Sequence, residues 1–196
     1  MYIAKFFIAI STILISLTLT AQIKVNPDIQ KKFDAFVELS NQKKWDQAFD
    51  LMYPKLFTQV PKQDLVDLMT SMEQDGLSFT RSNIKFKASA EPVVEGNETF
   101  VKVDYTGDLT VKITEGSIYD APKAISGMTE QFQTSYGKEN VKWDETGKQY
   151  TILVTISMIA IQNNNQWYLI EINKDQMGLM ESLFPAPVME ALVRTE

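Results

Sequence analysis

The chain has 196 residues, of which 44% are hydrophobic and 22% charged, and its formal net charge is −6 at pH 7. It contains no histidine and no cysteine, which excludes Ser-His-Asp triads, histidine-containing zinc sites, thiolate nucleophiles and disulfide frameworks. The acidic balance without a Lys/Arg cluster argues against nucleic-acid binding, because neutralisation of phosphates supplies most of that affinity.

Residues 1–21 have the pattern of an export signal. Lys5 supplies the positive start, and the apolar run over residues 6–19 is too short for a membrane span of roughly 20 apolar residues. Ala21 stands at the expected cleavage position, with an uncleaved N-terminal anchor as the alternative. We therefore expect an exported protein, periplasmic or extracellular, whose mature chain is residues 22–196 and has no stable membrane span.

The first third of the mature chain has helical periodicity. Helices are expected to begin at Pro27, Trp45 and Pro61, each with one apolar face. Trp45, Ala48 and Phe49 share a helical face, because they follow one another at the spacing i, i+3 and i+4. We expect this face to be buried against a sheet.

From Leu77 the apolar period changes from that of a helix to the alternation of strands. The phase of the alternation shifts at residues 81–83, which predicts a bulge or bend, and Gly107 allows a second strand to bend. A helix is expected over residues 122–137. A turn is expected at residues 144–147, with Gly147 at the positive-φ position, and Asp175 is expected to cap a last helical stretch. The expected fold is therefore a single α+β domain, with N-terminal helices packed on a strongly curved, mostly antiparallel sheet that has an inserted helix. Strands are expected near residues 77–90, 101–113, 141–143, 150–161 and 167–172.

The order of the elements resembles that of the nuclear-transport-factor-two-like superfamily, a cone-shaped α+β fold. The resemblance is carried by residues 45–48 (WDQA), 51–54 (LMYP), 65–69 (LVDLM), 158–161 (MIAI) and 166–170 (QWYLI). It implies a concave pocket between sheet and helices, which in that family is an isomerase or dehydratase site, a ligand cup, an interaction surface, or a space filled with side chains. A cystatin-like arrangement of helix on sheet is the alternative.

Asp104 and Asp108 lie on one face of a predicted strand, with Lys102 and Lys112 outside them. Carboxylate pairs can carry out acid–base catalysis. The same pattern is typical of a solvated strand face, and this interpretation is favoured because the two carboxylates are expected about 13 Å apart. We assign neither residue to a catalytic site.

Arg81 lies at the predicted bulge. There it can bind a carboxylate or phosphate, or it can reach solvent at the sheet edge, and the second interpretation is favoured. Aromatic residues on the strands can line a ligand cup but are more often part of the core. No P-loop, dinucleotide fingerprint or nucleophile elbow is present, so no catalytic, cofactor-binding or metal-binding residue is assigned. The strand aromatics are Tyr105, Trp143, Tyr150, Trp167 and Tyr168.

These observations predict an exported, non-catalytic binding or interaction module of the cell envelope, a monomer or homodimer without cofactor. Its expected partner is a small ligand in the concave pocket, or an envelope protein, which the sequence does not identify. The alternative is a pocket enzyme (an isomerase, dehydratase or hydrolase) that uses Asp/Glu and Tyr. An enzyme should place a carboxylate within hydrogen-bond reach of a tyrosine at the pocket floor, whereas a binding cup should be aromatic-lined and mostly apolar.

Overall fold

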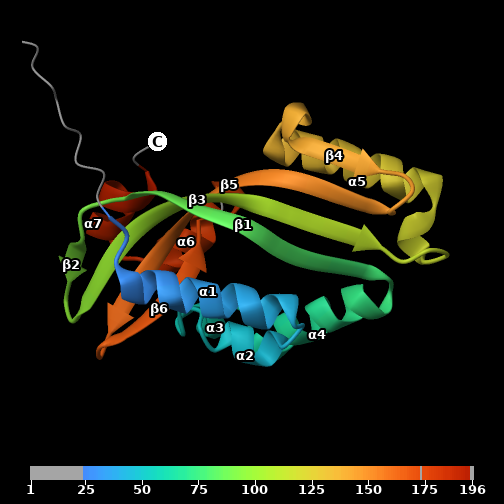
Figure 1. Ribbon diagram of the computed structural model, residues 1–196. Coiled ribbons are helices and arrows are strands. Elements are labelled where there is room, and N and C mark those ends of the chain that lie inside the picture. Colours follow the sequence, from blue (N-terminus) through green and yellow to red (C-terminus); the bar gives the residue numbers. More distant parts are fainter. Residues whose placement is uncertain (1–23, 173, 195–196) are drawn as a thin grey trace, which may run out of the picture.

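The computed structural model describes residues 24–172 and 174–194 (Figure 1). The expected export signal therefore lies outside the described residues. Six antiparallel strands form one curved, open sheet in the order β1-β3-β5-β4, with β2 also beside β3 and β6 also beside β5. The strands are β1 (Leu77–Ser89), β2 (Val93–Glu95), β3 (Glu98–Ile113), β4 (Val141–Asp144), β5 (Gln149–Asn163) and β6 (Gln166–Glu171).

Helices cover both ends of this sheet, which confirms the expected α+β fold. Helices α1 to α4 lie below the long strands in Figure 1, and α5 lies above them beside β4. Within the described residues, no helix combines the length and the apolar character that a membrane span requires. The helices are α1 (Pro27–Asn41), α2 (Trp45–Phe49), α3 (Leu56–Gln59), α4 (Lys62–Gln74), α5 (Pro122–Tyr136), α6 (Met177–Leu183) and α7 (Ala186–Val188), with 3-10 turns at η1 (Ile118–Asp120), η2 (Lys138–Asn140) and η3 (Lys174–Gln176) and a π-turn at η4 (Met189–Val193).

Helix α1 begins as its sequence predicts. The Asn26 side chain accepts a hydrogen bond from the backbone N–H of Asp28 at 2.8 Å, and proline occupies the first helical position, where no N–H is needed. Ile29, Phe33 and Phe36 are then buried on one face. This apolar stripe fixes α1 against the sheet.

The pairing register assigns the strand residues to two faces. Val103 and Tyr105 of β3 lie on the face that contacts α1, together with Met158 of β5. Phe100 of β3 and Ile159 of β5 lie on the opposite face and pack against the C-terminal helices α6 and α7. Both faces are therefore apolar at this end of the sheet, whereas β3 is polar on one face farther along.

A bulge interrupts β1 where the phase shift predicted it. The register between β1 and β3 shifts between Ser82 and Lys85, and Asn83 in the bulge has a positive φ of 53°. Gly107 lies opposite, where a Cβ atom would approach the Cδ1 atom of Ile84 to 2.6 Å. Gly107 therefore makes room for the bulged strand, in addition to the bending expected of it.

The β4–β5 turn differs from expectation. Gly147 was expected to take the positive φ, but Lys148 does so, with φ 49°. The physical reason is that Asp144 Oδ1 accepts hydrogen bonds from the N–H groups of Thr146 and Gly147, both at 3.0 Å. These bonds fix the backbone of the turn as far as Gly147, so the next residue, Lys148, adopts the left-handed conformation. Similarly, Asp175 lies inside a 3-10 turn and does not cap α6.

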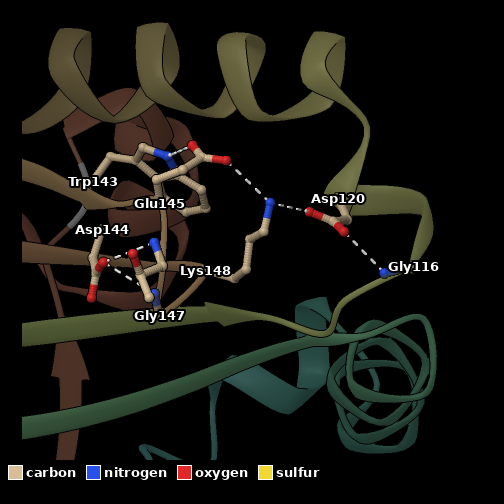
Figure 2. Close-up of polar contacts among 8 residues, drawn as sticks. Gly116, Asp120, Trp143, Asp144, Glu145, Gly147 and Lys148 are labelled. Carbon is tan, nitrogen blue, oxygen red and sulfur yellow. Dashed lines mark hydrogen bonds and ion pairs between the residues drawn. The ribbon is translucent and has the colours of Figure 1, made fainter.

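This turn is tied to the loop that follows β3. Figure 2 shows Lys148 between two carboxylates, with its Nζ 3.1 Å from Asp120 and 3.2 Å from Glu145. Trp143 Nε1 donates to Glu145 at 2.7 Å, and the Gly116 N–H donates to Asp120 at 2.9 Å (Figure 2). Because these polar groups bind one another, we assign them a structural role in closing this end of the sheet.

Candidate functional site

An apolar cavity of about 420 Å³ lies between α1, α2, α4, α6 and the sheet. Its volume falls within the range of roughly 300–1,000 Å³ found for small-molecule sites. Most of the lining is apolar, with methionine, leucine and isoleucine side chains beside five aromatic rings. The aromatic lining residues are Phe33 and Phe36 of α1, Trp45 and Phe49 of α2, and Phe79 of β1.

Charged groups enter this lining at one point, from β1 and β6. Arg81 Nη2 lies 3.2 Å from Glu171 Oε1, and the Tyr105 hydroxyl donates a hydrogen bond to the same oxygen at 2.8 Å. The guanidinium also lies over the Phe36 ring, 5.7 Å from its centroid. The cavity therefore has one polar, charged end in a largely apolar wall, with Gln176 as the uncharged polar residue of its described lining.

The last residue of α1 holds Arg81 in place. Asn41 Nδ2 donates to the backbone carbonyl of Arg81, and the Arg81 N–H donates to Asn41 Oδ1, both at 2.8 Å. The side-chain amide thus continues the hydrogen bonding of β1 on the side away from β3. This pairing fixes the backbone directly before the bulge, so the position of the guanidinium is set by α1 as well as by the sheet.

The electrostatics of this group favour hydrogen bonding over proton transfer. Burial acts against the charge on Arg81, but the attraction of Glu171 and the interactions with Tyr105 and Tyr136 together outweigh it, so the pKa of Arg81 is raised. Burial, together with the charge of Glu171, raises the pKa of Tyr105 far above its ordinary value. Arg81 is therefore charged and Tyr105 protonated throughout the neutral pH range.

The Trp45 face is buried as expected, but it lines the cavity, and helix α2 does not pack mainly on the sheet, against which this face was expected to lie. Trp45 is 6% exposed, and its Nε1 donates to Glu73 of α4 at 3.0 Å. Helix α2 packs mainly against α1 and α4. Lys62 at the start of α4 pairs with Asp46 of α2 at 2.8 Å. No residue of α4 is buried, so polar contacts with α2 contribute much of what holds this helix over the cavity.

The structure does not bring the two strand aspartates to the cavity. Asp104 and Asp108 lie on the opposite face of β3 from Tyr105, because strand residues alternate between faces. Asp104 accepts a hydrogen bond from Ser157 at 2.6 Å, and Asp108 accepts one from Asn83 at 2.6 Å. This placement agrees with the interpretation as a polar strand face.

Of the strand aromatics, only Tyr105 reaches the polar end of the cavity. Tyr150 instead hydrogen-bonds the Ile125 carbonyl at 2.7 Å and packs under α5 beside Trp143. Trp167 is buried in the core, and Tyr168 donates to Gln166 at 2.9 Å. None of the five strand aromatics is a lining residue, and the aromatic lining comes from α1, α2 and Phe79 of β1.

Glu171 was not singled out from the sequence, although a signal for it exists. It shares the strand parity of Trp167 and Leu169, which are both buried. A carboxylate at the third inward position of a strand needs a partner, and Arg81 is that partner.

A buried carboxylate lies outside the cavity lining. Glu98 is 9% exposed and accepts hydrogen bonds from Tyr53 at 2.9 Å, Lys55 at 3.0 Å and Asn163 at 2.8 Å. Burial acts to raise its pKa, but these three partners hold the pKa of Glu98 below its ordinary value. Since each partner is a protein group, Glu98 joins the loop after α2 to the sheet.

No group of three or more acidic side chains within the described residues is arranged to hold a metal ion. Comparison with protein-family models finds no match, and comparison with curated proteins finds none either. Function is therefore inferred from the cavity and its polar end.

Proposed function

We propose that this protein is an exported, non-catalytic binding module that holds a small, largely apolar molecule in the cavity. The observation that carries the proposal is the lining, in which five aromatic rings and several aliphatic side chains surround about 420 Å³ with a single charged pair. Apolar burial supplies affinity in such sites, and a few fixed polar groups supply orientation.

The contact between Tyr105 and Glu171 favours a second candidate, an isomerase, dehydratase or hydrolase. A carboxylate beside a tyrosine at the polar end of a pocket is the arrangement expected of acid–base catalysis. However, Arg81 binds the same Glu171 oxygen, and the raised pKa of Tyr105 opposes its use as a base. These contacts favour a role in positioning a ligand.

Export and family membership belong to the same proposal. The sequence pattern of residues 1–21 supports export to the periplasm or the exterior. Helices α1 to α4 on one side of a bent antiparallel sheet support membership of the nuclear-transport-factor-two-like superfamily. We expect the purified exported chain to begin at Gln22, as a monomer or homodimer. An intact mass that includes residues 1–21 would contradict cleavage.

The binding function is tested by filling the cavity. Leu109 and Leu179 line it, so the double variant Leu109→Trp/Leu179→Trp should narrow it from two sides. Leu153 and Leu68 are 49% and 54% exposed, and Leu153→Trp/Leu68→Trp provides the same change outside the cavity.

Native mass spectrometry of each protein, purified from its own source, measures which small molecule is retained. We expect a bound molecule in the wild type and in the surface variant, and its loss from the cavity variant. Equal retention by both variants would contradict the proposed site. If the wild type retains no molecule, and turnover of a candidate substrate requires Glu171, the enzyme is supported instead.

A further inference from the structure

We propose, on the basis of the binding function above, that the molecule carries one uncharged hydrogen-bonding group, such as a hydroxyl or amide, on an apolar body. This group is held at the pair formed by Arg81 and Glu171. The proposal concerns the chemical class of the ligand, and it follows from the charge balance and the hydrogen-bonding groups of the cavity wall.

The charges at the polar end of the cavity balance each other. Among the described residues that line the cavity, Arg81 and Glu171 are the two that carry a charge. They lie 3.2 Å apart and neutralise each other. Tyr105 and Tyr136 are the titratable groups near the pair, and burial raises the pKa of both, so neither adds a charge at neutral pH. The polar end of the cavity is therefore neutral as a whole.

The pair offers a donor and an acceptor side by side. A guanidinium has five N–H donors in a rigid fork, and a carboxylate has two acceptor oxygens. The hydrogen bonds that Glu171 accepts from described residues, from Arg81 and Tyr105, both go to Oε1. A hydroxyl is itself one donor and one acceptor. It can accept from the guanidinium and donate to the carboxylate without disturbing the ion pair.

A charged ligand fits this site less well. A ligand carboxylate at Arg81 would lie beside Glu171, and a ligand ammonium at Glu171 would lie beside Arg81. Each charge would also lose part of its hydration at this end of the cavity, where the Arg81 and Glu171 side chains are 23% and 35% exposed, and desolvating an unpaired ion is costly. Discrimination against both charged forms is therefore built into the pairing of Arg81 with Glu171.

Four ligands with one ring system separate these possibilities: naphthalene, 2-naphthol, 2-naphthoate and 2-(aminomethyl)naphthalene. The rings match the aromatic lining, and only the polar group changes. Equilibrium dialysis against the purified protein at pH 7 gives each affinity directly. We expect 2-naphthol to bind about tenfold or more tightly than naphthalene, since hydrogen bonds to charged groups are the stronger kind. The two charged ligands should bind more weakly than naphthalene.

Two variants change the preference in opposite directions. Glu171→Gln is nearly isosteric and leaves the charge of Arg81 without a counter-charge. The affinity for 2-naphthoate should therefore rise about tenfold or more relative to the affinity for 2-naphthol. Arg81→Met leaves the charge of Glu171 without a counter-charge, so the affinity for 2-(aminomethyl)naphthalene should rise by a similar factor relative to 2-naphthol. Glu115→Gln, at an exposed position after β3, is the control and should keep the wild-type order. Thermal melting verifies that each variant is folded, and the Glu171→Gln result alone suffices if Arg81→Met does not fold.

The outcomes separate the inference from the function on which it rests. Wild-type protein that binds 2-naphthoate best, or binds naphthalene as tightly as 2-naphthol, overturns the inference and leaves the binding function standing. Failure of all four ligands to bind overturns both. An affinity ratio of 2-naphthoate to 2-naphthol that is unchanged in Glu171→Gln also overturns the inference, because the preference for the hydroxyl would then not depend on the pair.

Discussion

Replacing Glu98 by glutamine is expected to lower the free energy of unfolding at pH 7 by about 2–4 kcal/mol. Glu98 is 9% exposed and accepts hydrogen bonds from Tyr53, Lys55 and Asn163. A glutamine side chain keeps one acceptor oxygen but turns an N–H₂ group toward donors, so at least one buried donor loses its partner. A hydrogen bond to a buried charged group contributes about 1.5–3 kcal/mol. The Lys55 side chain is 52% exposed, so its ion pair with Glu98 contributes less than about 1 kcal/mol to the free energy of unfolding.

The loss should depend on pH, and its direction follows from the pKa. Burial opposes ionisation of Glu98, but hydrogen bonds from Lys55, Asn163 and Tyr53 outweigh it, and the pKa is lowered. A carboxyl group whose pKa is lower in the folded state stabilises that state above its unfolded pKa, about 4.3 for glutamate. This contribution is lost as the pH falls through the folded pKa. The difference in the free energy of unfolding between wild type and Glu98→Gln should therefore have its full size at pH 7 and become smaller in acid below about pH 4.

Urea unfolding monitored by tryptophan fluorescence measures both effects, at pH 7 and across the acid range. Glu115→Gln removes the same charge from an exposed position and should change the stability by less than about 0.5 kcal/mol. A double-mutant cycle with Tyr53→Phe should show a coupling of about 1–2 kcal/mol, since the two side chains hydrogen-bond directly. A loss below about 0.5 kcal/mol, or one that is as large in acid as at pH 7, would refute the assigned role of Glu98.

Three further substitutions test how the cavity wall is held, each measured by the free energy of unfolding. Trp45→Ala should cost about 3–5 kcal/mol because a buried indole is removed, and an unchanged melting temperature would contradict its place in the core. Asn41→Ala should cost about 1–2 kcal/mol because both backbone groups of Arg81 lose their partner, whereas a neutral effect would mean that water replaces the amide. Gly107→Ala should cost about 1–3 kcal/mol through overpacking, and Ile84→Val should restore part of the loss in the double variant if the Cδ1 contact is the cause.

The arrangement of helices and strands could largely be predicted from the sequence, because it depends on local patterns. The change of apolar period at Leu77 coincides with the first residue of β1, and the parity break after Arg81 coincides with the bulge. Gly137 ends α5 with a positive φ of 88°, as a glycine after a helix commonly does. In each case the residues that determine the feature are close together in the chain.

Other features depend on side-chain contacts that the periodicity does not contain. The short helix α3, which begins at Leu56, was not expected, and the positive φ in the β4–β5 turn lies at Lys148 instead of Gly147. Asp144 decides the second case through its two hydrogen bonds to the turn. Several turns were compatible with the sequence of that segment, and a single carboxylate selects among them.

The polar end of the cavity could not be predicted for a further reason. Strands β1 and β6 are separated by β3 and β5, so in a flat sheet Arg81 and Glu171 would lie on the order of 14 Å apart. Their actual contact is 3.2 Å, with Tyr105 of β3 bonded to the same carboxylate oxygen. Strand curvature and long side chains together close this distance. The parity of Glu171 indicates an inward carboxylate, but only the degree of bending decides that its partner is an arginine 90 residues earlier. The site is therefore a consequence of sheet curvature, and changes that flatten the sheet near the bulge should weaken it without touching either charged residue.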